Sequence, residues 1–214
     1  MKKLIFIIAI SFELLSCSKS NPNKSMINEN ETLQDSIAMP SKEAIDRAIA
    51  YNTIDSAKVK SLQSLFIVKK DEFNDYAWIK PKSRPIYVNS NGFYCYFAKN
   101  NDGTVSNFRF VGQYASSEWL FIKKVVFNID GENVQFYPED IKTDHDTSIW
   151  EWFDEQIVSS NSDLINKIAN AKKVKVRFHG DQYYDDKVMS QSNIKSIKNT
   201  LEYYKAFGGR FSSY

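Results

Sequence analysis

The spacing of apolar residues changes along this chain, and the middle of the chain has a period of two. Between residues 73 and 153 there are runs in which apolar side chains occur at every second position, as they do at Phe93, Cys95 and Phe97. This alternation is typical of β-strands, whose side chains point in turn to opposite faces of a sheet. Residues 119–122, Trp-Leu-Phe-Ile, are apolar without interruption and predict a central strand.

Short connections between these strands predict an antiparallel meander. Residues 100–103, Asn-Asn-Asp-Gly, separate two alternating runs, and Asp130-Gly131 separates two others. Asp-Gly is a strong signal for a two-residue hairpin turn. Parallel strands need a long crossover, so connections this short favour antiparallel pairing.

Apolar residues spaced three and four apart predict helices before the strand region. Ser41 is a suitable N-cap for a first helix, and residues 45–49 supply its apolar face. A second helical segment is expected to begin at Asp55 or Ser56, so that residues 41–67 form a helical lead-in.

Two further helices and a strand are predicted near the C-terminus. Residues 162–173 have apolar positions at helical spacing, and residues 174–180 alternate like a half-buried strand. Residues 192–207 form the last helix, which Gly208-Gly209 ends. The order of elements predicts an α+β fold, in which helices pack on one face of an antiparallel β-meander sheet.

The first residues have the layout of a secretory signal. Lys2 and Lys3 precede an apolar run at residues 4–10. A helix that spans a bilayer needs about 20 mostly apolar residues, so this run is too short to cross a membrane. It is followed by residues 14–17, Leu-Leu-Ser-Cys, and then by a polar stretch.

Residues 14–17 resemble the lipobox of bacterial lipoproteins. In that family a small residue precedes a cysteine whose thiol receives diacylglycerol, and the signal is cut just before that cysteine. The resemblance implies that Cys17 is lipidated. Acyl chains contribute about 0.8 kcal/mol per buried CH₂, so a multiply acylated Cys17 would hold the chain on a membrane. An ordinary secretory signal and an uncleaved anchor are the alternatives.

This resemblance divides the chain into three parts. Residues 1–16 are the expected signal peptide. Residues 17–40, rich in Ser, Asn, Lys and Glu, are the lipidated cysteine and a flexible tether. Residues 41–214 are a single α+β domain. The expected location is the cell envelope, lipid-anchored and facing the periplasm, with exposure at the cell surface as the alternative.

The composition is that of a globular protein and argues against nucleic-acid binding. The 214 residues are 43% hydrophobic and 25% charged, and 28 Lys and Arg against 26 Asp and Glu leave a net charge of +2. That balance, without long basic runs, gives little electrostatic attraction to nucleic acid. If Cys17 carries lipid, Cys95 has no disulfide partner, and its place between Phe93 and Phe97 predicts a buried, unreactive thiol.

No metal or cofactor motif is present in the sequence. His145 lies in Asp144-His145-Asp146, but adjacent side chains diverge and cannot converge on one ion, so a solvated loop is expected there. The sequence also lacks a Gly-rich phosphate loop, a serine elbow and zinc-ligand spacing. We therefore expect no cofactor and no metal.

Residues 174–180 offer a cationic strand face. Lys175, Arg177 and His179 alternate with apolar residues there, so they share one side of the strand. Such a side could hold an anionic ligand or a partner. A water-facing strand side, balanced by the acids that follow, is the alternative.

Trp150 and Trp152 form the second candidate surface. In an extended strand the two indoles share a face, and if exposed they could stack on a sugar or a peptide. Large aromatic side chains are also common in cores, so a core position is the alternative.

Residues 119–209 also resemble uncharacterised bacterial envelope proteins. The resembling elements are residues 119–122, 150–152 and 177–186 and the last helix with its Gly-Gly end. That group has no assigned activity, so the resemblance implies a location and no reaction.

The absence of catalytic motifs favours a non-catalytic binding or interaction module. Its expected contacts are the membrane, through lipid on Cys17, and an unknown envelope protein or small ligand. One alternative is a hydrolase of envelope polymers with acids among Glu151, Asp154, Asp181 and Asp185. Another is a structural or assembly partner that meets an envelope protein through exposed aromatic residues.

Overall fold

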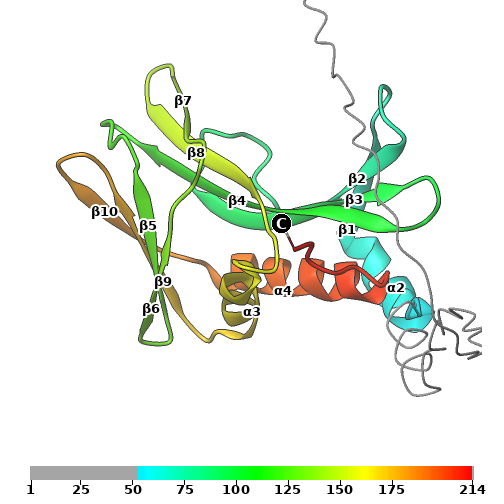
Figure 1. Ribbon diagram of the computed structural model, residues 1–214. Coiled ribbons are helices and arrows are strands. Elements are labelled where there is room, and N and C mark those ends of the chain that lie inside the picture. The colour runs from blue at the N-terminus through cyan, green and yellow to red at the C-terminus, as the bar shows by residue number, and fades with distance from the viewer. Residues whose placement is uncertain (1–52, 214) are drawn as a thin grey trace, which may run out of the picture. The chain divides into compact units, whose positions relative to one another are not determined.

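Two antiparallel sheets and three α-helices make up residues 53–213, the part of the chain that the computed structural model describes (Figure 1). All of these residues belong to the compact unit Pro40–Tyr214. The predicted signal peptide, Cys17, the tether and the helix expected from Ser41 lie outside the described residues.

The larger sheet consists of a four-stranded meander and a hairpin, formed by β7 and β8, that pairs with the last strand of the meander. Strands β1 to β4 pair in sequence order, and β8 then pairs with β4, which gives the order β1-β2-β3-β4-β8-β7. The strands are β1 (Phe66–Lys70), β2 (Tyr76–Pro81), β3 (Gly92–Asn100), β4 (Val105–Ser116), β7 (Lys142–His145) and β8 (Ile149–Gln156). The predicted loop after residue 100 joins β3 to β4.

The chain between β4 and β7 forms a hairpin that leaves the larger sheet. Its strands β5 (Lys124–Ile129) and β6 (Glu132–Phe136) join β9 (Val174–His179) and β10 (Tyr184–Val188) in a second sheet of order β10-β9-β5-β6. The predicted hairpin turn at Asp130 and Gly131 is confirmed by their φ angles of 50° and 103°. The sequence predicted one sheet, whereas β5 pairs with the distant β9 and so creates a second.

The helices begin close to the predicted positions. Asp55 caps α2 (Ser56–Leu62) by accepting the Lys58 N–H at 2.9 Å, and η1 (Gln63–Leu65) follows. Helical structure ends there, because Phe66 already belongs to β1. α3 (Ser162–Asn170) and α4 (Gln191–Ala206) bury the predicted apolar stripes, which are Leu164, Ile165 and Ile168 in α3 and Ile194, Ile197, Leu201 and Tyr204 in α4.

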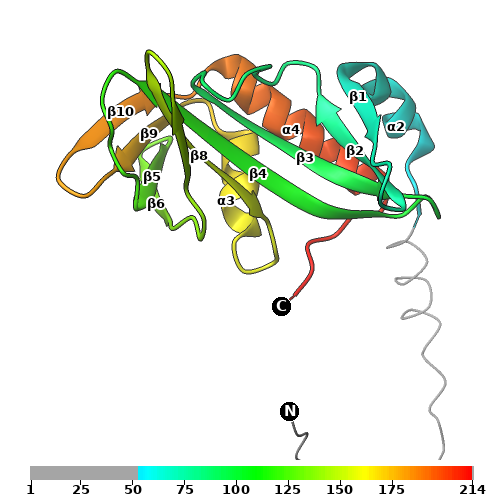
Figure 2. The same ribbon diagram turned by 90° about the horizontal axis from the view of Figure 1, so that it is seen from above.

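The predicted α+β class is confirmed, with the helices on one side of the larger sheet. α4 packs against β3, and α2 and α3 pack against α4. Figures 1 and 2 show the three helices on the same side of β2, β3 and β4, with the smaller sheet at one end. The opposite side of the larger sheet carries no helix of residues 53–213.

Aromatic rings fill the space between the two sheets and the helices. The ring centroid of Phe93 in β3 lies 5.9 Å from that of Phe178 in β9. Phe97, also in β3, lies 5.4 Å from Tyr204 of α4. Full burial of one such side chain is worth roughly 1.5–3 kcal/mol, so these contacts hold both sheets and α4 together.

Cys95 is fully buried in this core, as the sequence predicts. Burial, and to a smaller extent the charge of Asp154, raises the pKa of its thiol well above the ordinary value. The reactive thiolate is therefore disfavoured at this position.

Residues 119–122 form a loop between β4 and β5, so the prediction of a central strand is wrong. Leu120 and Ile122 are buried, which accounts for the apolar run. Their backbone N–H groups each donate to the carboxylate of Glu151 at 2.8 Å, and the N–H of Phe121 donates to it at 2.9 Å. The buried carboxylate of Glu151 thus accepts hydrogen bonds from three N–H groups. In a central strand, such N–H groups would donate to the strands on either side.

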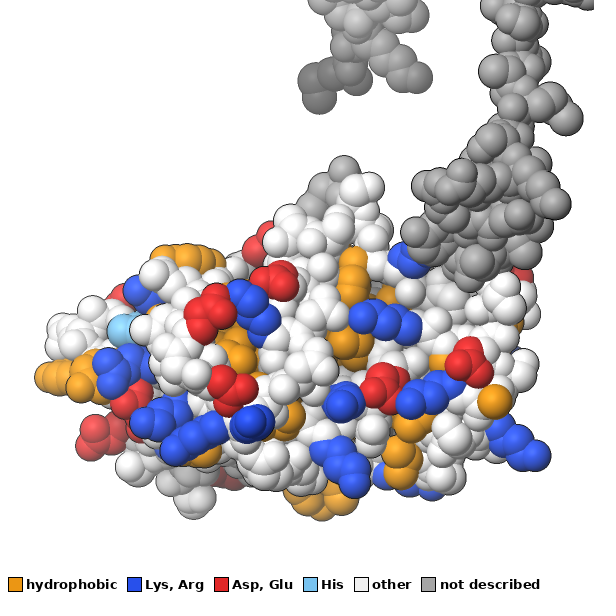
Figure 3. Space-filling view, turned by 90° about the horizontal axis from the view of Figure 1, so that it is seen from below, with side chains coloured by type: hydrophobic (Ala, Val, Ile, Leu, Met, Phe, Trp, Pro, Cys, Tyr) orange, Lys and Arg blue, Asp and Glu red, His pale blue; other side chains and the backbone are white. Residues whose placement is uncertain are grey.

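The surface on the helix side carries charges of both signs. Seen from below, Lys and Arg side chains are spread across it with Asp and Glu among them (Figure 3). Within residues 53–213, no helix has the length and apolar character needed to cross a membrane.

Candidate functional site

The outer face of the smaller sheet carries the three cationic residues that the sequence singled out. Lys175, Arg177 and His179 alternate along β9 with buried apolar residues. Paired residues of antiparallel strands point to the same side, so this face continues onto β5, β6 and β10. We call it the cationic face, and it consists of Lys124, Val126, Asn128, Asn133, Gln135, Lys175, Arg177, His179, Tyr184, Asp186 and Val188.

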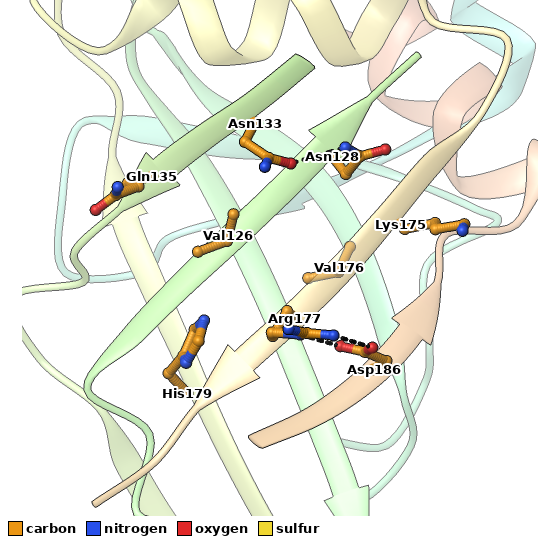
Figure 4. Close-up of a pocket in the computed structure, with 9 residues that line it drawn as sticks. All are labelled: Val126, Asn128, Asn133, Gln135, Lys175, Val176, Arg177, His179 and Asp186. Carbon is orange, nitrogen blue, oxygen red and sulfur yellow. Dashed lines mark hydrogen bonds and ion pairs between the residues drawn. The ribbon is translucent and has the colours of Figure 1, made fainter. Parts of the chain in front are cut away.

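The cationic face contains a hollow of about 510 Å³ (Figure 4). Amide side chains from β5 and β6 line one part of it, and Asn128 donates to Asn133 at 2.7 Å. Charged residues from β9 and β10 line the other part. Its volume falls within the range of small-molecule sites, roughly 300–1,000 Å³, although its walls are more polar than is usual for such sites.

Arg177 is held in one orientation by two neighbours on β10. Its Nε and Nη2 donate to the two carboxylate oxygens of Asp186 at 2.6 and 2.7 Å. The guanidinium also lies 3.9 Å from the ring centroid of Tyr184. These bonds lower the pKa of the Asp186 carboxyl, so the only carboxylate of the cationic face is already paired.

His179 is mainly uncharged at pH 7. Partial desolvation lowers its pKa below the ordinary value of 6.5, and the positive charges of Lys124 and Arg177 lower it further. A neutral imidazole can both donate and accept a hydrogen bond. His179 therefore adds a polar group to the hollow and becomes a cation only in acid.

Two lysines of the cationic face have no carboxylate partner. Lys124 and Lys175 form no ion pair with any residue of the described range 53–213. The face therefore holds three cationic side chains, including Arg177, against the single carboxylate of Asp186. This local excess of positive charge suits an anion or an acidic partner surface.

Trp150 and Trp152 lie on a different surface, the outer side of the larger sheet. They share this side of β8, as the spacing predicts, opposite Ala115 and Gln113 of β4. Trp150 is only 7% exposed, whereas Trp152 is half-buried. Neither residue lines the hollow of the cationic face, and Trp150 cannot serve as an exposed stacking surface in this conformation.

A group of aromatic side chains on this outer side was not predicted from the sequence. The ring of Trp78 in β2 lies 5.1 Å from that of Tyr96 in β3. The Tyr96 hydroxyl donates to Asp154 at 2.6 Å, and Arg109 donates to the same carboxylate at 2.6 Å. The signal was present, because Tyr94 and Tyr96 occupy the non-core positions of an alternating strand, where polar residues are the rule.

The four acids proposed for hydrolysis are each engaged elsewhere. Glu151 is fully buried and binds the loop of residues 119–122, while Asp154 points to the other face of β8. Asp181 lies 3.6 Å from Lys123, and Asp185 accepts from Tyr114. The contacts of these four acids therefore hold the fold together and give no support to the hydrolase hypothesis, which needs two carboxyls that face each other across a cleft.

His145 lies on an edge strand rather than in the expected loop. It ends β7, is exposed, and its ring centroid lies 5.9 Å from that of Trp119. Within the described range 53–213, no group of three or more His, Cys, Asp and Glu side chains could hold a metal ion.

Comparison with known family models, curated proteins and solved structures found no match to this chain. The geometry of the cationic face and the sequence of the N-terminal region are therefore the features that bear on function.

Proposed function

We propose that this chain is a lipoprotein of the bacterial cell envelope, anchored through lipid on Cys17. Its folded domain is a non-catalytic module that binds an anionic ligand or an acidic partner at the cationic face. The observation that carries the binding proposal is the gathering of Lys124, Lys175 and Arg177 on one sheet face with a single, already paired carboxylate. Lys175 and Arg177 line the hollow of this face, and Lys124 lies beside His179, which also lines it.

The anchor is supported by the order of features at the N-terminus. A basic start, a short apolar run and the sequence Leu-Leu-Ser-Cys at residues 14–17 stand in the order that lipid modification requires. An attached lipid would keep the module at a membrane surface and raise the concentration of envelope ligands around it.

Metabolic labelling with an alkyne-tagged fatty acid tests the anchor. We expect the full chain, expressed in a bacterium, to take up the label and to lose it in the Cys17→Ser variant. Cys95→Ser removes the only other cysteine and should label like the unchanged chain. An unlabelled chain that retains Met1 would refute the anchor.

Titration with sulfate, pyrophosphate and heparin tests the cationic face. These probes offer anionic groups of increasing charge, and the unlipidated Cys17→Ser chain can be used in solution. We expect at least one probe to bind with a salt-dependent affinity, and Lys124→Ala or Lys175→Ala to weaken binding roughly threefold or more.

Lys198→Ala is the matched control, because Lys198 is exposed on α4 and lies outside the cationic face. It should leave the affinity unchanged. Equal losses in all three lysine variants would indicate unspecific charge attraction, and no binding of any probe would refute an anion site.

A further inference from the structure

The loop of residues 117–123 presents two stacked aromatic rings at the surface. The ring centroids of Trp119 and Phe121 lie 5.6 Å apart, with an angle of 13° between their planes. Phe121 is 51% exposed, and the ring of His145 meets Trp119 at 5.9 Å. We call Trp119, Phe121 and His145 the aromatic platform.

The backbone of Phe121 adopts a conformation that a phenylalanine rarely takes. Its φ angle is 56°, in the left-handed region where Cβ crowds the following carbonyl. The other non-glycine residues with positive φ in the described part of the chain are Asn107 and Asp130, and these are residue types that tolerate this region. Glycine or asparagine would therefore suit position 121 better than phenylalanine.

The backbone of Phe121 contributes a hydrogen bond to the fold, whereas its ring is exposed. The Phe121 N–H is one of three that donate to the buried carboxylate of Glu151. The side chains on either side, Leu120 and Ile122, point into the core. A glycine at position 121 could keep the same hydrogen bond. Among the described contacts, only the stacking on Trp119 calls for an aromatic side chain at this strained position.

We infer that the aromatic platform is a stacking site for a neutral saccharide. A pyranose ring has one face of C–H groups, which packs on an aromatic ring, and hydroxyl groups around its edge. Hydrogen-bonding groups lie close to the platform. Lys123 follows Phe121 by two residues and pairs with the exposed Asp181, and His145 contacts Trp119. The fixed loop presents the Phe121 ring without a further cost of ordering it.

The charges and size of the surroundings favour a neutral sugar over other ligands. Lys123 and Asp181 lie 3.6 Å apart and offset each other, so this region lacks the positive excess of the cationic face. A stable protein interface buries about 800 Å² on each partner around an apolar centre. A single exposed ring beside charged side chains matches one sugar ring better than an interface of that size.

Calorimetric titration with chitotriose, maltotriose and cellotriose tests this inference, with the fluorescence of Trp119 and the other tryptophans as a second signal. We expect at least one of these neutral trisaccharides to bind the full, unlipidated Cys17→Ser chain. Phe121→Gly should weaken that binding about tenfold or more and should keep or raise the melting temperature. Phe73→Ala removes a phenylalanine that is 94% exposed elsewhere and should change neither property.

A second variant separates loss of the ring from loss of the fold. Phe121→Leu keeps an apolar side chain without a flat face, and it should melt like the unchanged chain and lose saccharide binding. Lys175→Ala, which tests the cationic face, should leave saccharide affinity unchanged. The anion site and the saccharide site can therefore be refuted independently of each other.

Three outcomes would overturn the saccharide site. The first is that no trisaccharide binds at concentrations up to about 10 mM. The second is that Phe121→Gly lowers the melting temperature by several degrees, which would show that the ring serves the fold. The third is that a photocrosslinker at position 121 captures a protein partner while the chain binds no saccharide.

Discussion

Gly180 lies against the backbone of Leu120 so closely that a Cβ on Gly180 would fall 1.8 Å from the Leu120 carbonyl oxygen. Gly180 follows β9, and Leu120 belongs to the loop that carries the aromatic platform. The backbone N–H of Lys123 also donates to the carbonyl of His179 at 2.8 Å. The loop therefore packs directly on the end of β9, and only a residue without a side chain fits there.

Gly180→Ala is expected to lower the free energy of unfolding by about 1–3 kcal/mol, because the backbone of Leu120 would have to move away. Urea unfolding followed by circular dichroism measures the loss. Gly103→Asn is the comparison, since Gly103 has no atom within 4 Å of its Cβ position, so that any loss there comes from its φ of 90° and not from crowding. Equal stability of Gly180→Ala and the unchanged chain would contradict the close packing.

Glu151→Gln should destabilise the fold although it changes almost no volume. The carboxylate accepts three backbone N–H groups in a fully buried site, whereas the NH₂ group of glutamine cannot accept a hydrogen bond. At least one N–H would lose its acceptor, at a cost of about 2–4 kcal/mol in the free energy of unfolding.

Glu155→Gln provides the comparison for Glu151→Gln. Glu155, also on β8, accepts two backbone N–H groups near the surface, from Glu139 and Asp140. Water can replace a lost partner there, so the expected cost is below about 1 kcal/mol. Hydrogen exchange at residues 120–122 should accelerate in Glu151→Gln alone. Unchanged exchange in that variant would refute the role of Glu151 in holding the loop.

Features that depend on near neighbours in the chain could be predicted from the sequence. The hairpin turn at Asp130 and Gly131 follows from two adjacent residues, and the buried face of α4 follows from spacing alone. The common side of Lys175, Arg177 and His179 also follows from alternation along one strand.

Features that depend on distant segments could not be predicted in the same way. Residues 119–122 are as apolar as a central strand, and only the buried carboxylate of Glu151, about thirty residues later, makes them a loop. The second sheet arises because β5 pairs with β9, although β6, β7, β8 and α3 lie between these two strands in the sequence. Alternation in the sequence shows that a strand has a buried face, but it does not show which sheet that strand joins.

The same limit applies to the candidate surfaces. The amides of Asn128 and Gln135 complete the hollow around Arg177, although they come from β5 and β6. Trp150 and Trp152 share a face, yet the neighbours that reduce the exposure of Trp150 to 7% come from other parts of the chain. Exposure is a property of the assembled sheets, so the sequence left both alternatives for these tryptophans open.

Two tyrosines of the larger sheet should make folding sensitive to alkaline pH. Burial, followed by the charge of Asp154, raises the pKa of Tyr94 to about 12. Burial and the hydrogen bond to Asp154 raise the pKa of Tyr96 as well. The unfolded chain loses these protons near pH 10, so the stabilising contribution is complete below pH 10 and falls as the pH rises toward 12.

Phenolate absorbance and urea unfolding between about pH 9 and 12 measure this effect. We expect part of the tyrosine absorbance to change only above pH 11 or together with unfolding. Tyr96→Phe should reduce the alkaline loss of stability, and Tyr137→Phe, at a tyrosine that is 63% exposed, should not. A single titration of all tyrosines near pH 10 in the folded protein would contradict the burial of Tyr94 and Tyr96.

His179 should make anion binding at the cationic face stronger in acid. Its pKa lies below the ordinary 6.5 because of partial desolvation and the charges of Lys124 and Arg177, so it is mainly uncharged at pH 7. Tyr184 and Asp186 face it from β10, and Asp186 is occupied by Arg177. As the pH falls through this lowered pKa, His179 adds a positive charge beside the hollow.

Sulfate is a suitable probe for His179, because its charge stays constant between about pH 5 and 8. We expect sulfate affinity to rise as the pH falls below 6.5, and this rise to disappear in His179→Gln. Folding should show the opposite sign, because the unfolded chain binds the proton first, so stability falls as the pH drops through the same window. His145→Gln changes the other histidine of the chain and should keep both pH dependences. If His145→Gln abolishes the rise in sulfate affinity and His179→Gln does not, the hollow on the smaller sheet is not where the anion binds.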